Sequence, residues 1–424
     1  MVRAAKKVEC KCGRRLHHPK MDKQMKMTQV RGCAAGRNWI VILALTAASI
    51  LHATRLNAAD SIADRDAVSH RLDKHIKSLA QLELAFLDCW LKPDDSATNP
   101  ATIVGPPAAG VSADLHWTAS EPLIGPVDRD GDHYFADKDP SFVQHAGRWH
   151  LFCTVRGRKR SHQIEYLSFP DWEHCEQAER HMLPLTDNYC CAPSVFYFRP
   201  QKKWYQVYQY SDSSQDRSRK PGFSTNADVG KWRDWTKPAP LFAEPDQLVK
   251  NWIDFWVICD EAKAYLFFTS DDGRMWRSDA KIDDFPHGWS KPALILQGDI
   301  FEASHTYRLH GRQQYLTIIE AIGPNGRRYY KSYSAQTLDG KWEPEAAAWE
   351  RPFAGLRNVA TAGRHWADSI SHGELFRMGT DERMEVDPAH LRLLFQGVSD
   401  EQMKDKPYGE IPWRLGILDA VGPE

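Results

Sequence analysis

Short runs of aromatic and β-branched residues fill the chain from about Leu115 to its end. Between these runs stand Gly, Pro, Asn and Asp, and no long helical period appears. Runs of this kind, bounded by turn residues, indicate β-strands joined by short connections. We therefore expect residues 114–424 to form one all-β domain.

The same pair of strands recurs along this domain, with an aromatic residue near the start of the second strand. The copies begin at Pro140, Pro193, Phe255, Ala303 and, more loosely, His372. Their starts lie roughly 50 to 70 residues apart, close to the repeat length of four-stranded propeller blades. The predicted fold is a five-bladed β-propeller. A large β-sandwich is the alternative, because short strands alone do not distinguish the two.

Three segments of different composition precede the predicted propeller. Residues 1–59 combine basic residues with an apolar run and a small-residue end, which is typical of a secretory signal peptide, with Met27 as a possible later start. Residues 60–91 place apolar side chains at three- and four-residue steps and predict a short amphipathic helix. Residues 92–113 have the composition of a linker. The predicted location is secreted or periplasmic. A retained membrane anchor is the alternative, although the apolar run is shorter than the roughly 20 residues of a spanning helix.

Charge and composition narrow the partners only a little. The 55 basic and 56 acidic residues nearly balance, which argues weakly against nucleic acid or an anionic membrane as partner. The 16 Trp among abundant aromatic residues fit either buried strand positions or platforms for sugar rings. No organic cofactor is expected.

The predicted mature chain keeps an even number of cysteines. They are Cys89, Cys153, Cys175, Cys190, Cys191 and Cys259. An even number in an exported protein permits disulfides, whose pairing the spacing does not give. Buried free thiols are the alternative, because several of these cysteines lie within apolar runs.

An acidic residue directly precedes the strand pair in three copies of the repeat. These residues are Asp139, Asp254 and Glu302. The innermost strands of a propeller line one central channel, so the three carboxyl groups should converge, and burial of like charges should keep one of them protonated. Glycoside hydrolysis needs such an acid to protonate the leaving oxygen and a carboxylate to activate water or attack the sugar. The alternative for each acid is a purely structural turn cap.

The motifs around these acids resemble those of glycoside hydrolase family 62, whose members are α-L-arabinofuranosidases. The resemblance covers about Leu115 to Asp419. Its motifs include Lys138-Asp139-Pro140-Ser141, Ile253-Asp254, Phe301-Glu302-Ala303-Ser304, Glu320-Ala321-Ile322-Gly323, Ser371-His372-Gly373-Glu374, Pro352-Phe353-Ala354-Gly355 and Tyr408-Gly409.

This resemblance implies a role for each acid. Asp139 is expected to be the general base, Glu302 the general acid, and Asp254 the carboxylate that raises the pKa of the acid and helps to orient the sugar. The implied mechanism inverts the anomeric centre, so the carboxyls of base and acid should lie roughly 6.5–9.5 Å apart. The expected reaction is release of α-L-arabinofuranosyl side groups from arabinoxylan or arabinan, plant cell-wall polysaccharides, by a monomer.

The resemblance also implies neighbours of the catalytic acids. Lys138 and Tyr408 are expected to bind the arabinose, and Tyr210 stands where family members often carry Trp beside the sugar. Glu320 and Arg328 are expected to border the pocket, with an ion pair that holds a blade together as the alternative.

His372 is expected near a cation in the central channel, usually calcium. Calcium prefers oxygen ligands, so waters would have to complete its shell. A hydrogen-bonded channel histidine without a metal is the alternative.

Two other functions compete with the predicted one. A related propeller hydrolase, similar to family 43, would act on xylosides or on the arabinan backbone with the same three acids. A catalytically silent propeller would only bind carbohydrate, which the presence of both Asp139 and Glu302 disfavours.

Overall fold

The protein is described by a computed structural model over residues 115–211, 220–243, 249, 251–361 and 363–421. The predicted signal peptide, amphipathic helix and linker lie outside the described residues. Within them, strands dominate, and the helices are a few single turns. These turns are η1 (Trp172–Gln177), η2 (Arg199–Gln201), η3 (Ile282–Asp284), η4 (Pro324–Gly326), α3 (Asp400–Met403) and η5 (Tyr408–Glu410).

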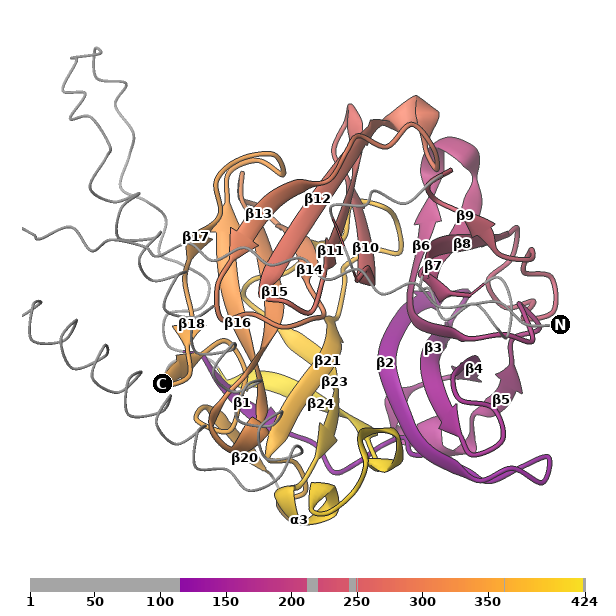
Figure 1. Ribbon diagram of the computed structural model, residues 1–424, viewed down its shortest axis with the longest axis vertical. Helices are drawn as coiled ribbons and strands as arrows, with labels where there is room; N and C mark the ends of the chain where they lie inside the picture. Colours follow the sequence, from indigo (N-terminus) through magenta and orange to yellow (C-terminus); the bar gives the residue numbers. More distant parts are fainter. Residues whose placement is uncertain (1–114, 212–219, 244–248, 250, 362, 422–424) are drawn as a thin grey trace, which may run out of the picture. The chain divides into compact units, whose positions relative to one another are not determined.

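Five sheets follow one another along the chain (Figure 1). The first contains β2 (Tyr134–His145), β3 (Arg148–Gly157), β4 (Gln163–Phe169) and β5 (Glu179–Met182). The second contains β6 (Cys190–Phe198), β7 (Lys203–Tyr210), β8 (Lys220–Asn226) and β9 (Ala239–Pro240). The third contains β10 (Ile253–Cys259), β11 (Lys263–Thr269), β12 (Arg274–Lys281) and β13 (Ala293–Gln297). Each of these sheets is an antiparallel meander, as in a propeller blade.

The fourth and fifth sheets carry additional short strands. The fourth contains β14 (His305–Leu309), β15 (Tyr315–Ile322), β16 (Arg328–Ala335) and β17 (Glu343–Pro344), with β22 (Glu385–Val386) parallel to β14. The fifth contains β21 (Ser369–Leu375), β23 (Arg392–Val398), β24 (Arg414–Val421) and β1 (His116–Ala119), with β20 (Val359–Thr361) parallel to β1. A separate ribbon pairs β18 (Ala347–Ala348) with β19 (Arg351–Pro352).

The predicted five-bladed propeller is therefore confirmed, and the β-sandwich alternative is wrong. Each predicted strand pair forms two neighbouring strands of one sheet, and the first strand of each pair is the innermost of its blade. Neighbouring innermost strands contact one another, β2 with β6 and β21, and β10 with β6 and β14. Residues at corresponding positions of these strands therefore meet around one axis.

The fifth blade is completed by the first strand of the domain. β1 pairs antiparallel with β24, so that Trp117 lies opposite Ala420. The Trp117 side chain is 1% exposed, and its indole N–H donates to the carbonyl of Phe353 at 2.6 Å. The ring of blades is thus closed by noncovalent pairing of distant segments.

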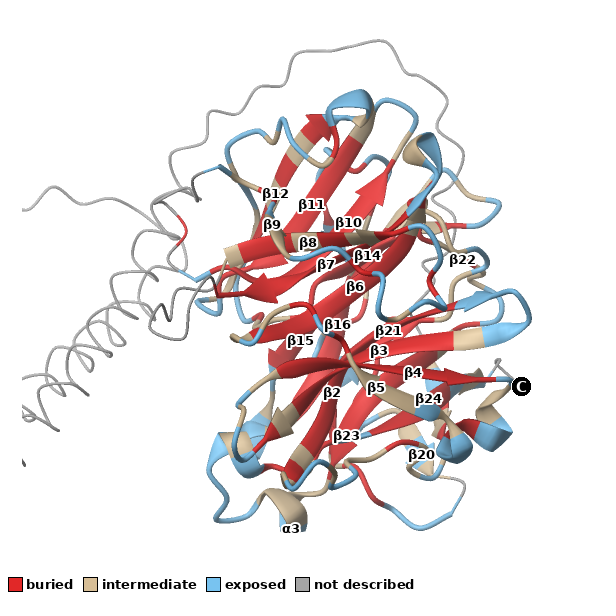
Figure 2. Cartoon of the chain, turned by 90° about the vertical axis from the view of Figure 1, so that its right-hand side faces the viewer, coloured by how far each residue is buried: buried red, intermediate tan, exposed pale blue. Residues whose placement is uncertain are grey.

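Buried residues run along the strands, and exposed residues gather in the turns (Figure 2). All seven residues of β10 are buried, and so are all seven of β21. β10 is apolar apart from Asp254, whereas β21 buries Ser369, Ser371, His372 and Glu374. Buried polar groups need hydrogen-bond partners. The polar residues buried on these innermost strands are therefore candidates for a functional site.

The five described cysteines are all buried free thiols, at Cys153, Cys175, Cys190, Cys191 and Cys259. For these five residues, the interpretation as buried free thiols therefore holds, and not the one as disulfides. Cys89 lies outside the described residues. No helix among the described residues is long and apolar enough to cross a bilayer.

Candidate active site

Three innermost strands are bulged at the end of the channel where the predicted acids lie, and the segment before β14 shares their backbone conformation. The pairing of β2 with β3, β6 with β7 and β10 with β11 shifts register there. Asp139, Ala192, Asp254 and Ala303 have positive φ angles of 49°, 52°, 57° and 54°. A non-glycine residue in this region costs on the order of 1–3 kcal/mol and is typical of functional sites. Such bulges redirect side chains, and here they carry Asp139 and Asp254.

Glu302 does not occupy the same repeat position as the two aspartates. Ala303 has the bulged position in the fourth blade, and Glu302 precedes it. The backbone of Glu320 faces this segment, because its N–H donates to the Glu302 carbonyl at 2.9 Å and its carbonyl accepts from Phe301 N at 2.7 Å. Glu302 therefore stands one residue before the position that Asp139 and Asp254 occupy in their blades, and its side chain is one methylene longer than theirs.

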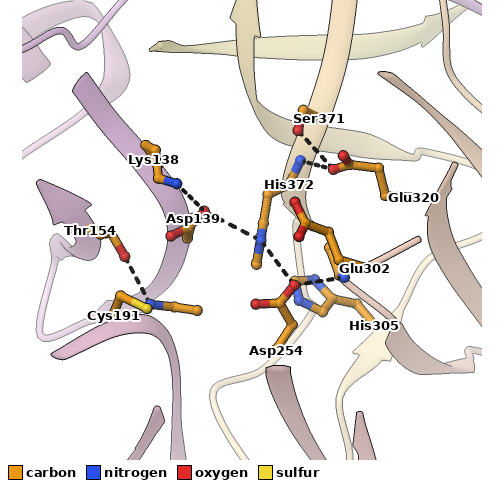
Figure 3. A network of polar contacts seen from close by, with 12 residues as sticks. Lys138, Asp139, Thr154, Cys191, Asp254, Glu302, His305, Glu320, Ser371 and His372 are labelled. Atoms are coloured by element: carbon orange, nitrogen blue, oxygen red, sulfur yellow. Dashed lines mark hydrogen bonds and ion pairs between the residues drawn. The ribbon is translucent and has the colours of Figure 1, made fainter. Parts of the chain in front are cut away.

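A pocket of about 170 Å³ opens between the bulged strands. Five predicted site residues line it, together with the sixth, His372, from β21 at its centre. The lining residues are Lys138, Asp139, His162, Tyr189, Cys191, Gln209, Ile253, Asp254, Glu302, His372 and Tyr408. All three predicted catalytic acids thus lie in one pocket (Figure 3).

Asp139 lies between two positively charged or ionisable groups. Its Oδ1 is 3.9 Å from Lys138 Nζ and 3.4 Å from His372 Nδ1. Burial alone would raise the pKa of Asp139, but Lys138, His372 and a hydrogen bond with Thr154 hold it below its ordinary value. Asp139 is therefore a carboxylate, the state that a general base needs.

The Lys138 side chain also lies over Tyr408, with Nζ 5.2 Å from the ring centroid. Tyr408 is 53% exposed, on the single turn η5 at the mouth of the pocket. An exposed aromatic ring in this place can stack on a sugar.

Asp254 lies beside the same ring nitrogen of His372 as Asp139 does. Its Oδ2 accepts from the backbone N–H of Ala303 at 2.9 Å and lies 3.7 Å from His372 Nδ1. Burial raises the pKa of Asp254, His372 opposes the rise, and the charge of Asp139 adds to it. His372 thus faces both aspartates (Figure 3).

Glu302 is in the opposite protonation regime from Asp139. Burial raises its pKa well above the ordinary value, and the charges of Glu320 and Asp254 raise it further, whereas Arg328 and Lys138 oppose the rise. Arg328 Nη1 lies 3.3 Å from Glu302 Oε1 but 2.5 Å from Glu320 Oε1. The Glu302 side chain is 17% exposed and faces the pocket. A glutamic acid that keeps its proton near neutral pH can donate it, so Glu302 is the candidate proton donor of the site.

Three predicted substrate neighbours lie outside the lining of the pocket. Tyr210 is 6% exposed at the end of β7, in the apolar cluster of the first two blades, where it packs against Gly222. Glu320 is fully buried behind the acid, and Arg328 reaches the site only through its contact with Glu302. The Tyr210 ring thus lies over a glycine and not in the lining of the pocket where the sugar is expected. Glu320 and Arg328 form the ion pair that the alternative interpretation expected, between neighbouring strands β15 and β16.

Four residues of the lining could not be recognised from the sequence. Gln209 donates to the Trp252 carbonyl at 2.9 Å and accepts from the Cys191 thiol at 3.2 Å. His162 and Tyr189 lie side by side, with ring centroids 4.8 Å apart. Their sequence carries no acid–base motif. Only the start of the second repeat at Pro193, close to Cys191, pointed to this part of the second blade.

The donor set around His372 fits a calcium ion poorly. Calcium takes six to eight oxygen ligands, whereas His372 offers a nitrogen and only two carboxylates, those of Asp139 and Asp254, are in contact with its Nδ1. Across the described ranges, only Asp137, Cys153 and Glu165 lie close enough together to suggest a metal cluster. Arg180 already pairs with both carboxylates of that cluster. No catalytic step is therefore assigned to a metal.

Comparison with known proteins identifies the family of the chain. Residues 116–419 match the profile of glycosyl hydrolase family 62. Alpha-L-arabinofuranosidase C of Cellvibrio japonicus is 36% identical over 318 residues, which are 73% of this chain and 47% of that protein. The chain thus spans about half the length of this curated relative.

Two solved structures are similar over nearly their whole length. The catalytic domain of a family 62 alpha-L-arabinofuranosidase from Coprinopsis cinerea is 35% identical, with a TM-score of 0.69 over 73% of this chain and 98% of that one. An alpha-L-arabinofuranosidase from Podospora anserina, solved with cellotriose, is 34% identical, with a TM-score of 0.68 over 74% of this chain and 98% of that one. The profile match and these identities show that the chain belongs to glycosyl hydrolase family 62.

Proposed function

We propose that this protein is an inverting α-L-arabinofuranosidase that releases arabinofuranosyl side groups from arabinoxylan or arabinan. One observation carries the proposal. Asp139 and Glu302 line the same pocket, but the pKa of Asp139 is lowered and the pKa of Glu302 is raised. A carboxylate and a carboxylic acid in one pocket are the pair that hydrolysis of a glycosidic bond requires.

Each acid has one step in the proposed reaction. Glu302 gives its proton to the oxygen that links the arabinose to the polymer, and that bond to the anomeric carbon breaks. Asp139 takes a proton from a water molecule, whose oxygen bonds to the anomeric carbon from the opposite face. Asp254, fixed by the Ala303 N–H, raises the pKa of Glu302 and orients the sugar. The products are arabinose of inverted configuration and the polymer without that side group.

The size of the pocket favours a single terminal sugar. Its volume of about 170 Å³ is below the range of about 300–1,000 Å³ typical of drug-sized ligands. One pentose ring can enter, with the polymer lying across the mouth beside Tyr408. Removal of side groups fits this shape better than cleavage within a chain.

The identity of the polymer is supported by the relatives. One family 62 hydrolase that is 32% identical, with a TM-score of 0.67 over 73% of this chain and 98% of that one, was solved with xylotriose. An arabinofuranosidase from Lactobacillus brevis, at 15% identity and a TM-score of 0.50, is similar in fold alone. Xylotriose is a fragment of a xylan backbone, so its binding to this relative supports arabinoxylan as the polymer. Release of xylose instead of arabinose would favour the family 43-like alternative.

The function is tested by Glu302→Gln in the full chain. We expect kcat on wheat arabinoxylan to fall about 100-fold or more, because a general acid contributes 10²–10⁴-fold. Glu343→Gln, on the exposed outer strand β17, is the matched control and should leave kcat unchanged. NMR of the wild-type reaction should show the inverted anomer first. Unchanged turnover by Glu302→Gln would overturn the assignment of the acid, and first appearance of the retained anomer would overturn inversion.

We also propose that the protein is exported and monomeric. Export is supported by the composition of residues 1–59, and a monomer by a pocket that brings Asp139, Asp254 and Glu302 together within one chain. Cell fractionation and sedimentation test these two points.

The calcium prediction has weaker support from the donor set. Prolonged treatment with EDTA should therefore leave kcat within about twofold of the untreated enzyme, and a larger loss that calcium restores would favour a metal at His372.

A further inference from the structure

A fully buried glutamate lies behind the proposed acid and outside the pocket. Glu320 stands on β15 with none of its surface exposed. It cannot touch the sugar, because the pocket is lined by other residues. A buried carboxylate is costly unless it is paired and hydrogen-bonded, so its partners indicate why it is there.

Both oxygens of Glu320 are occupied. Oε2 accepts from the Ser371 hydroxyl at 2.7 Å and from the backbone N–H of His372 at 2.8 Å. Oε1 accepts from Arg328 Nη1 at 2.5 Å. The two bonds from β21 fix the carboxylate, so that Oε1 alone faces the guanidinium (Figure 3 shows the first two).

Arg328 is also held on its other side. Its guanidinium carbon lies 4.1 Å from the centroid of the Phe301 ring, a cation–π contact. Its Nη1 is shared unequally, because Glu320 Oε1 lies at 2.5 Å and Glu302 Oε1 at 3.3 Å. The closer partner of this arginine is thus the buried glutamate and not the acid.

This unequal sharing matters because a cation favours the carboxylate form of a neighbouring acid. If the charge of Arg328 were not balanced, its contact with Glu302 at 3.3 Å would favour the carboxylate form and hold Glu302 without its proton. Glu320 supplies the balancing charge at shorter range. The negative charge of Glu320 also raises the pKa of Glu302, after burial itself.

We propose that Glu320 is a positioning residue for the general acid: it neutralises Arg328 and holds it at a distance, so that Glu302 keeps a transferable proton. The proposal rests on the proposed function, in which Glu302 is the acid. It changes the expected role of Glu320 from a border of the pocket to a group that acts through Arg328.

The test compares two leaving groups. A 4-nitrophenyl arabinofuranoside loses its stable phenolate with little help from an acid, whereas the sugar oxygen of arabinoxylan must be protonated. For Glu320→Gln we expect kcat on arabinoxylan to fall about 100-fold, and kcat on the nitrophenyl substrate to fall by less than about tenfold. KM should stay within about twofold, because Glu320 does not line the pocket. Glu320→Asp keeps the charge and should recover part of the loss on arabinoxylan.

The matched control is Glu382→Gln. Glu382 is also a buried glutamate bound to an arginine, since its Oε1 accepts from Arg199 Nε at 3.0 Å, but it does not line the pocket. Its removal should change stability without changing the ratio of the two kcat values. That ratio is measured within one preparation, so it does not depend on the fraction of folded enzyme.

Equal losses on both substrates for Glu320→Gln, or no loss on either, would overturn the proposal. Glu302→Gln, measured in parallel, separates the two levels of inference. If Glu302→Gln itself shows no larger loss on arabinoxylan than on the nitrophenyl substrate, the proposed acid is wrong. If Glu302→Gln shows the difference and Glu320→Gln does not, only the role of Glu320 fails.

Discussion

The first and fourth blades each place a carboxyl group next to a cation in the same pocket, with opposite results. In the first blade, Lys138 lies beside Asp139 and lowers its pKa. In the fourth blade, Arg328 lies beside Glu302, yet the pKa of Glu302 is raised well above its ordinary value. The difference is that Arg328 already has Glu320 as a closer partner. A neighbouring cation therefore says little about protonation until its other partners are counted.

The largest expected effect tests the base side of this comparison. Asp139→Asn removes the group that accepts a proton from water, so kcat should fall about a thousandfold. The loss should be similar on arabinoxylan and on the nitrophenyl substrate, because water must attack whichever group leaves. Steady-state kinetics on the two substrates measure this. A loss confined to arabinoxylan would mean that Asp139 serves as the acid and that the comparison is reversed.

A smaller effect is expected from the cation of the first blade. Burial raises the pKa of Asp139 and the charge of Lys138 lowers it, so Lys138→Met should raise this pKa. The base would then lose its active carboxylate form at a higher pH. The acidic limb of the kcat/KM profile should therefore move to higher pH, with about a tenfold loss on the acidic side for each pKa unit. The exposed Lys203 of β7 provides the control, Lys203→Met, which should leave the profile in place.

The smallest effect concerns stability, where the two acids should again differ in sign. The lowered pKa of Asp139 stabilises the fold above the pKa of the unfolded carboxyl, and this is lost as pH falls through the folded pKa. The raised pKa of Glu302 costs stability as pH rises from the unfolded value towards the folded one.

At neutral pH, Asp139→Asn should therefore destabilise the protein and Glu302→Gln should stabilise it, each by about 1 kcal/mol. The corresponding shifts in Tm are roughly 2–4 °C in opposite directions. Thermal unfolding monitored by circular dichroism measures both, and shifts of the same sign would contradict the assigned protonation states. Repeating the measurement below the pKa of the unfolded carboxyls should remove the gain of Glu302→Gln.

The sequence was sufficient to predict the five blades, because the same pair of strands, with an aromatic residue near the start of the second, recurs in each of them. It was also sufficient to predict that Asp139, Asp254 and Glu302 meet. The bulges could not be predicted, since Ala192 and Ala303 adopt positive φ without the glycine or asparagine that usually marks it.

Side-chain direction explains the remaining differences. Tyr210 was expected beside the sugar, whereas its ring packs over Gly222, which has no side chain in the way. Glu320 was expected at the border of the pocket, but it turns inward to Ser371 and the backbone of His372. Such choices depend on which neighbours supply room or hydrogen-bond donors, and those neighbours come from distant parts of the chain.

Closure of the ring by β1 has a consequence for how the protein folds. The contacts between the β1 segment and β24 join residues as far apart as Ser120 and Ile417, which are 297 positions apart along the chain. Contacts of such high sequence separation form late and slow folding, because a long loop must be closed first. Until then, β24 presents an unpaired edge that can join another chain. We therefore expect nascent or refolding molecules to aggregate most readily just before this last strand is captured.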